Sequence, residues 1–295
     1  MPEELLYEGK AKKVFTTDEE GVLVHRYKDD ATAFNAQKRG SWKDKGRTNA
    51  TMSATIFAYL EAHGVPTHFV EQVDDAAIKT KKLDMLPIEV IVRNVAAGSL
   101  AKRLGYEEGR ELKAPIVELC YKDDELGDPL LNWYHFRELG VSDEDLEFCE
   151  ELGLKVNEIL TPFFDERGVT LVDFKIEVGR DADGKLMLAD EVSPDTCRFW
   201  DKETGERLDK DRFRRDMGGV EDAYAEMLQG ARDHAAGSGG LNSSQLSAFS
   251  GQLEVGSGRS CCRVVVPITD CLGSIPGTLS RPSDEKRTLK LKADS

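Results

Sequence analysis

The sequence predicts an α+β fold built from antiparallel strands and a small number of amphipathic helices. Short segments with a strand pattern, joined by polar turns, fill the first 30 residues, and a hairpin pattern spans residues 170–192. Two long helical patterns, near residues 49–60 and 143–160, lie between these strand-rich regions. Because hairpins rather than regular helical crossovers join the strands, a doubly wound parallel sheet is not expected.

Residues 1–80 are expected to form an N-terminal lobe rich in antiparallel β-structure. Strand segments are predicted at 5–7, 13–16 and 22–27, and the polar residues 18–21 form a turn before the third of them. This lobe is the first of two into which we expect the chain to divide.

Two long helices are expected from apolar residues that recur three or four positions apart. The first runs from about Asn49 to Gly64 with Met52, Ile56, Phe57 and Leu60 on one face. The second starts after Ser142, whose Ser-Asp-Glu-Asp sequence is typical of a capping box. Its core stripe consists of Leu146, Cys149, Leu152, Val156, Ile159 and Leu160.

Residues 81–229 are expected to form a larger α+β lobe. Strands are predicted at 77–83 and 88–95, with Pro87 between them. The hairpin pattern adds one strand at 170–178 and another at 185–192.

Two shorter helices complete this lobe. Ser99 is expected to cap a helix over 100–104 that Gly105 ends. A last helix is predicted from Arg212 to about Gln229.

Residues 230–295 differ in composition from the rest of the chain. Gly and Ser make up 20 of these 66 residues, and Phe249 is their one aromatic residue. Such a segment offers too little apolar surface to offset the entropy lost on ordering. We therefore expect a largely disordered tail that the activity does not require, with a partner-binding or oligomerising extension as the alternative.

The overall charge excludes some function classes. The chain carries 40 basic and 55 acidic residues, for a net charge of −15, which opposes binding to the phosphate backbone of nucleic acids. Apolar runs are far shorter than the ~20 residues of a membrane span, and the acidic N-terminus does not resemble a secretory signal. A cytoplasmic protein with no membrane or nucleic-acid partner is expected.

The strand over residues 171–177 has one apolar and one ionic face, since successive side chains alternate. Val172, Phe174 and Ile176 are predicted on the first face, and Asp173, Lys175 and Glu177 on the second. With a turn symmetric about residues 181–184, Lys175 lies opposite Asp190. The same register sets Glu177 opposite Leu188. Carboxylates around a lysine suit a magnesium nucleotide, and a solvent-exposed face with cross-strand ion pairs is the alternative.

Two further segments carry candidate binding residues. Gly9 permits close backbone approach in a tight connection, and Lys10 and Lys12 project to the same side, as a triphosphate cover would require. A plain basic turn explains the same residues. The turn at Pro194 brings Asp195 and Arg198 near the hairpin, where a purely structural ion pair is the alternative.

Six segments of the first 229 residues carry a further signal. Their sequences are YEGKAKKVF from residue 7, KGRTN from 45, KKLDMLPIE from 81, VRNVAAGSL from 92, LVDFK from 171 and SPDTCR from 193. In order and spacing they resemble one enzyme family, the phosphoribosylaminoimidazole-succinocarboxamide synthases or SAICAR synthetases. The tail from residue 230 has no counterpart in this pattern.

The resemblance implies a reaction and a fold. The family uses ATP to join the carboxylate of 5-amino-1-(5-phospho-ribosyl)imidazole-4-carboxylate to the amino group of L-aspartate, with release of ADP and phosphate in purine biosynthesis. It implies a two-lobed SAICAR synthetase-like fold with a kinase-like or ATP-grasp-like nucleotide cleft. The resemblance is compatible with a homo-oligomer.

The resemblance also implies roles for individual residues. Lys10 and Lys12 would contact the ATP phosphates, Lys81, Lys82 and Met85 would border the adenine, and Glu177 and Asp190 would hold Mg²⁺. Arg93, Ser99, Asp195 and Arg198 would bind the phosphoribosyl imidazole, with Lys175 and Asp173 as catalytic residues beside the reacting carboxylate. Two other functions remain open from the residues alone: a small-molecule kinase and a nucleotide-binding regulator without turnover.

Overall fold

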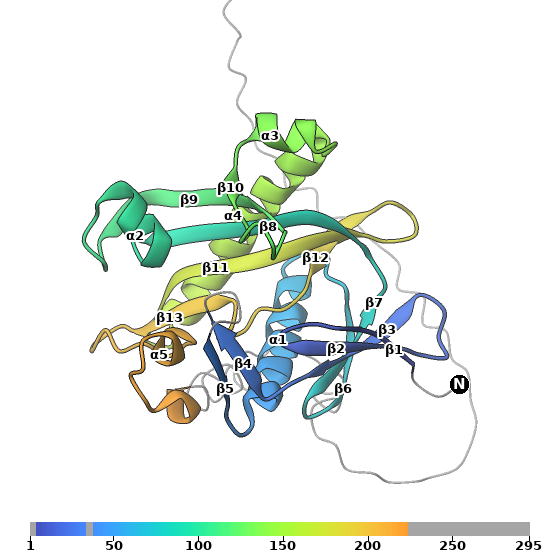
Figure 1. The fold of residues 1–295 in the computed structure, drawn as a ribbon, viewed down its shortest axis with the longest axis horizontal. Coiled ribbons are helices and arrows are strands. Elements are labelled where there is room, and N and C mark those ends of the chain that lie inside the picture. The colour runs from blue at the N-terminus through green and yellow to red at the C-terminus, as the bar shows by residue number, and fades with distance from the viewer. Residues whose placement is uncertain (1–3, 34–37, 224–295) are drawn as a thin grey trace, which may run out of the picture. The chain divides into compact units, whose positions relative to one another are not determined.

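The computed structural model describes residues 4–33 and 38–223, and these form antiparallel sheets with helices packed on them (Figure 1). The N-terminal sheet has five strands in the order β1-β2-β3-β7-β6. Their bounds are β1 Leu5–Glu8, β2 Lys12–Thr16, β3 Val22–Tyr27, β6 Phe69–Asp74 and β7 Ala77–Lys81. The strands predicted in this part of the chain are thereby confirmed.

A second, six-stranded sheet is centred on two long strands that pair with each other, β8 and β11. Its order is β10-β9-β8-β11-β12, and β13 also pairs with β11. The bounds are β8 Asp84–Val95, β9 Glu111–Tyr121, β10 Leu130–Leu131, β11 Val169–Arg180, β12 Leu186–Ala189 and β13 Cys197–Asp201. The short strands β4 Asp30–Ala33 and β5 Lys38–Ser41 pair separately.

The helices pack on these sheets. Helix α1 lies on β3, β6 and β7, and α4 lies on β8, β9 and β11. Their bounds are α1 Lys45–Ala62, α2 Gly98–Leu104, α3 Trp133–Glu138, α4 Asp143–Asp165 and α5 Asp211–Arg214. Gly153 lets α4 approach β8 closely, because a Cβ there would lie 3.0 Å from both Val90 Cγ1 and Val92 Cγ2.

One hydrophobic cluster joins the two sheets. It contains Phe57 of α1, Ile78 of β7, Val90 of β8, Leu160 of α4 and Ile176 of β11, all fully buried. Packing of this kind holds the N-terminal sheet in a fixed position on the second sheet. The two sheets therefore share one hydrophobic core.

The start of helix α4 agrees with the prediction from the sequence, and the start of helix α1 differs from it. Helix α4 starts as predicted, with the Ser142 hydroxyl accepting from the Asp145 N–H at 3.2 Å. Helix α1 begins at Lys45, before the predicted Asn49, although Gly46 is a poor helix former. Gly46 is required there by close packing, since a Cβ would lie 2.6 Å from the Tyr27 carbonyl oxygen.

Two predicted details were wrong. Helix α2 has Ala97 at its N-cap, so Ser99 lies inside the helix, although Gly105 ends it in a left-handed conformation as predicted. Pro87 lies within β8 and not between two strands. It is tolerated because the pairing of β8 with β11 is irregular there, and its carbonyl still accepts from the Lys122 N–H at 3.1 Å.

The predicted last helix is interrupted. Helix α5 ends at Arg214, and Gly218 and Gly219 then adopt positive φ angles of 71° and 58°, which an α-helix does not accommodate. Helical backbone resumes over residues 220–223. The remainder of the predicted helix and the tail over 230–295 lie outside the described residues.

Candidate active site

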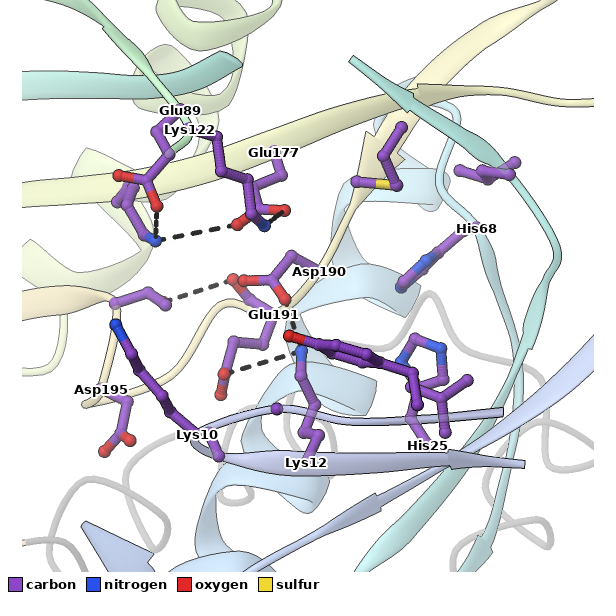
Figure 2. A pocket seen from close by; sticks show the side chains of 18 of the residues that line it. Lys10, Lys12, His25, His68, Glu89, Lys122, Glu177, Asp190, Glu191 and Asp195 are labelled. Carbon is purple, nitrogen blue, oxygen red and sulfur yellow. Dashed lines mark hydrogen bonds and ion pairs between the residues drawn. The ribbon is translucent and has the colours of Figure 1, made fainter. Parts of the chain in front are cut away.

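A cavity of about 670 Å³ lies between the N-terminal sheet and the ends of β8, β11 and β12 (Figure 2). Eight residues predicted for the site line it: Lys10, Lys12, Lys81, Met85, Lys175, Glu177, Asp190 and Asp195. Lys82 does not line it; that residue is exposed, and its N–H donates to the Gly21 carbonyl at 2.8 Å.

The centre of this cavity is a network of alternating charges. Lys175 contacts Glu89 on the neighbouring strand and lies 3.7 Å from the Glu177 carboxylate. Lys122 contacts Glu177 from the loop after β9. Lys12 Nζ lies 2.5 Å from Asp190 Oδ1, and so the β2 lysine joins the N-terminal sheet to the acidic residues (Figure 2).

Asp190 reaches this network by a route that differs from the predicted one. The register of β11 and β12 pairs Glu177 with Ala189 and Val178 with Leu188, one residue away from the prediction. The turn is one residue longer than predicted, because the Asp181 N–H bonds to the Lys185 carbonyl. Asp190 leaves the ladder after Ala189 with a left-handed φ of 66°, which Asp adopts more readily than most residues. This turn directs its carboxylate toward Lys12.

The charges in the network shift one another's ionisation. Burial opposes the charged form of Asp190, but Lys12, Lys175 and Lys122 outweigh it and lower the pKa of this carboxyl group. Burial and the Asp190 charge raise the pKa of Glu177, against the effect of the two neighbouring lysines. The pKa of Lys175 is raised by Glu177, Glu89 and Asp190 in spite of its burial. Asp190 and Lys175 therefore stay charged at neutral pH.

The acidic residues fit nucleotide-bound Mg²⁺ better than a metal held by protein alone. Within residues 4–33 and 38–223, no group of three or more His, Cys, Asp or Glu side chains has an arrangement that would hold a metal ion. Mg²⁺ on a nucleotide needs only one or two protein carboxylates, since phosphate oxygens supply further ligands. Glu177 and Asp190 face one cavity with lysines beside them, which suits that mode.

A second cavity of about 230 Å³ adjoins the first and is lined by arginines. Arg93 donates to Asp173 Oδ2 at 2.8 Å and to Ser99 Oγ at 3.1 Å. Arg198 Nη1 donates to the same Asp173 carboxylate at 2.8 and 3.0 Å, and its Nε donates to Asp211 at 2.9 Å. The buried Asp173 thus holds two guanidinium groups side by side, which can receive a phosphate or carboxylate.

Gly98 explains how Arg198 fits against α2. This glycine has a φ of 53°, and a Cβ on it would lie 2.7 Å from Arg198 Nη2. A larger residue would force the guanidinium group out of its place. Glycine is therefore favoured at this position for two reasons, the positive φ angle and the lack of space for a Cβ atom.

Four residues line both cavities: Lys175, Asp195, Thr196 and Arg214. Asp195 is buried and forms ion pairs with Lys45 at 2.8 Å and with Lys210 at 3.1 Å. Asp173 lines only the second cavity and not the first. The junction at Lys175 therefore connects a lysine and carboxylate compartment with an arginine compartment.

Several residues of the site were not predicted. These are Glu89, Lys122, Glu191, Lys45, Lys210, Arg214, His25 and His68. Lys45 belongs to one of the family-like segments, and Lys210 and Arg214 belong to a basic cluster, so the sequence held a signal for them. Val172 was placed on the wrong face. A bulge between Leu171 and Asp173 turns it toward Val95, Ala97 and Trp200.

His25, whose Nδ1 atom is buried, should make stability depend on pH. Burial lowers its pKa to about 3, and the Lys12 charge adds to this effect. The unfolded chain, with a pKa near 6.5, binds more protons than the folded one between these values, so the free energy of unfolding falls as pH drops below about 6.5. Urea unfolding measures the free energy of unfolding at pH 7.0 and at pH 5.5. Its decrease between these two pH values should be about 1 kcal/mol smaller in His25→Phe than in the parent. An equal decrease in the two proteins would contradict the assignment to His25.

No helix in the part of the chain that the structure describes combines the length and the apolarity that a membrane crossing requires.

Comparison with known proteins agrees with this geometry. The model of the SAICAR synthetase family matches residues 5–231. A phosphoribosylaminoimidazole-succinocarboxamide synthase of Desulfitobacterium hafniense is 57% identical over 231 residues, which cover 78% of this chain and 97% of the relative. The enzyme of the same name from Deinococcus radiodurans is 56% identical over 227 residues, 77% of this chain and 96% of the relative.

Solved structures give the same result. A SAICAR synthetase in complex with ADP superimposes with a TM-score of 0.75 at 51% identity and covers 77% of this chain and 97% of its own. SAICAR synthetase from Pyrococcus horikoshii gives a TM-score of 0.73 at 49% identity, with 76% and 98% covered. These matches confirm the predicted two-lobed α+β fold, and the chain belongs to the SAICAR synthetase family.

Proposed function

We propose that this chain is an ATP-dependent ligase that joins L-aspartate to 5-amino-1-(5-phospho-ribosyl)imidazole-4-carboxylate and forms the succinocarboxamide, ADP and phosphate. The observation that carries the proposal is the pair of adjoining cavities that meet at Lys175. One compartment suits a magnesium nucleotide and the other suits a phosphorylated acid. We place this step of purine biosynthesis in the cytoplasm, with small molecules as the reactants.

The larger cavity is assigned to ATP. Lys10 and Lys12 face the phosphates, while Lys81 and Met85 lie where the N-terminal sheet gives way to β8 and border the base. Glu177 and Asp190 would hold Mg²⁺, which when bound neutralises phosphate charge and orients the phosphoryl group. The lobes over 1–80 and 81–229 are proposed to enclose the nucleotide between them.

The smaller cavity is assigned to the imidazole substrate. Arg93, Arg198 and Ser99 provide donors for its phosphate, and the junction residues face its carboxylate. Asp173 fixes both arginines, which makes it a positioning residue in this proposal. Because Lys175 lines both cavities, its ammonium group lies where the carboxylate and the terminal phosphate of ATP would meet.

The chemistry follows from the weakness of a carboxylate as an electrophile. A carboxylate oxygen takes the terminal phosphoryl group of ATP and ADP leaves, which gives an acyl phosphate. The neutral amino group of aspartate then attacks the acyl carbon, phosphate leaves with that oxygen, and the nitrogen releases one proton. Positively charged Lys175 stabilises the transferring phosphoryl group, so catalysis rests on positioning and electrostatics.

This route predicts the fate of one oxygen atom. When the imidazole carboxylate carries ¹⁸O, one labelled atom should appear in inorganic phosphate for each succinocarboxamide formed, as mass spectrometry of the phosphate would show. Product formation with unlabelled phosphate would contradict the acyl phosphate, and absence of the succinocarboxamide would contradict the ligase itself.

The segment over residues 230–295 is proposed to be dispensable for this reaction. The family match ends at residue 231, and the aligned 231 residues already cover 97% of a relative. A chain truncated after Gln229 should keep kcat and KM within about twofold and its melting temperature within a few degrees, since the removed segment is rich in Gly and Ser and holds one aromatic residue. A large loss of activity, or a large fall in melting temperature, would show that the tail contributes to the working fold.

A further inference from the structure

A row of alternating charges crosses the second sheet at the arginine compartment. It consists of Glu118 on β9, Arg93 on β8, Asp173 on β11 and Arg198 on β13, in the order in which these strands pair (Figure 1). Asp173 pairs in the ladders with Arg93 and with Arg198. Glu118 pairs with Ile91, two residues before Arg93, so its side chain leaves the same face of the sheet. Arg93 therefore has a carboxylate on each of its two neighbouring strands.

The guanidinium group of Arg93 is held at all three of its nitrogen atoms. Nε donates to Glu118 Oε2 at 2.8 Å, Nη1 donates to Asp173 Oδ2 at 2.8 Å, and Nη2 donates to Ser99 Oγ at 3.1 Å. A guanidinium group has five N–H donors. Within the described residues, these bonds leave one N–H on each terminal nitrogen, and Arg93 lines the second cavity. Two such N–H groups match the oxygens of a phosphate.

Glu118 differs from the other two partners of Arg93 because it lines neither cavity. Asp173 and Ser99 both line the second cavity, where a ligand can contact them directly. Glu118 belongs to neither lining, and its exposed fraction is 7%. An effect of this carboxylate on a bound substrate must therefore act through the residues that it contacts.

The second oxygen of Glu118 has a different partner. Oε1 accepts from the guanidinium group of Arg103, which belongs to α2, the helix that also carries Ser99. One carboxylate thus serves the arginine that faces the cavity and the helix beside it. A glutamine could not serve both, because its amide has one acceptor oxygen and its NH₂ group would face a second donor.

We propose that Glu118 is a positioning residue for the phosphorylated imidazole substrate. Its carboxylate fixes the rotation of the Arg93 guanidinium group, so that the two remaining N–H groups are directed together at the substrate phosphate. Arg93 is 3% exposed, and a charge so deeply buried is tolerated because carboxylates pair with it from both neighbouring strands. This role rests on the proposed function and adds to it a residue that contacts no substrate.

The test measures the binding of two forms of the imidazole carboxylate. Titration calorimetry gives the Kd of the ribonucleotide, which carries the 5′-phosphate, and of the ribonucleoside, which lacks it. Glu118→Gln should weaken binding of the ribonucleotide about tenfold, the effect of one hydrogen bond between charged groups. Binding of the ribonucleoside should change less than about twofold, because it has no phosphate for Arg93 to contact. Saturating substrate should keep kcat within about threefold.

Further variants separate positioning from general damage. Glu118→Asp keeps the charge on a side chain that is one CH₂ shorter, and it should lose about threefold in affinity for the ribonucleotide. Arg103→Met removes the second partner but leaves the bond to Arg93, so its affinity should stay within about twofold of the parent. Glu111→Gln is the matched control, since Glu111 is an exposed residue of β9 that lines neither cavity. This control should bind both compounds as the parent does.

Three results would overturn the proposal. Folded Glu118→Gln could bind the ribonucleotide as tightly as the parent, or it could lose the same factor for both compounds. Arg103→Met could show the full loss of Glu118→Gln, which would place the effect in α2 and not in Arg93. Melting curves show which variants fold, and if Glu118→Gln does not, the first two criteria are applied to Glu118→Asp. Failure of the proposed ligase looks different, because the parent would then bind the ribonucleotide but form no succinocarboxamide.

Discussion

Glu177→Gln and Asp190→Asn are each expected to reduce turnover by at least about 100-fold while the fold is retained. Each change removes one negative charge from the site proposed for Mg²⁺ with almost no change of volume. Asn is well suited to position 190, because it tolerates the left-handed backbone that Asp190 adopts there. The loss should therefore arise from charge and not from strain.

Turnover at saturating Mg²⁺, together with melting temperature, checks this expectation. Glu71→Gln is the matched control, since Glu71 pairs with Lys79 on the surface of the N-terminal sheet and lies outside both cavities. That control should retain full activity. Activity like that of the parent in both site variants would refute the assignment of Glu177 and Asp190 to the metal.

Arg198→Lys is expected to raise the KM for the imidazole substrate about 100-fold and the KM for ATP less than about threefold. The guanidinium group of Arg198 contacts Asp173 and Asp211 through different nitrogens and lines only the second cavity. A lysine ammonium group cannot hold both carboxylates in that geometry and present a fork to the substrate. The effect should therefore fall on one substrate.

Initial rates with each substrate varied in turn measure the two KM values. Arg137→Lys provides the same chemical change at an exposed pair, where Arg137 Nε lies 2.6 Å from Asp143, and it should leave both KM values unchanged. If Arg198→Lys raised both KM values equally, the assignment of the second cavity to the imidazole substrate would fail.

The strand alternation around Lys175 was predictable from the sequence because it is a local property. Glu177 and Lys175 indeed line one cavity. Their partners Glu89 and Lys122 were not predictable in the same way, since they belong to β8 and to the loop after β9 and reach the site through strand pairing. Contacts between residues so far apart in the sequence cannot be predicted from a local pattern.

Asp190 shows a different limit of sequence reasoning. The turn after β11 is one residue longer than predicted and shifts the register by one residue, which alone would have moved Asp190 away from the ionic face. Its left-handed conformation compensates for this shift. Neither feature follows from an alternating pattern, and the bulge that turns Val172 away from its predicted face is a further case of the same kind.

The meeting of Arg93 with Arg198 was predictable only through the family resemblance. Nothing local links Arg93 and Arg198, which are 105 positions apart and both donate to the Asp173 carboxylate. Both β8 and β13 pair with β11 at this residue, which brings the two guanidinium groups together.

The most direct test of the ligase assignment is the dependence of ADP release on each substrate. With ATP and Mg²⁺ present, ADP release should continue through many turnovers only when the imidazole carboxylate and L-aspartate are both added, with one succinocarboxamide formed per ADP. Sustained ADP release with the imidazole carboxylate alone, or release that neither substrate changes, would contradict the proposed ligase.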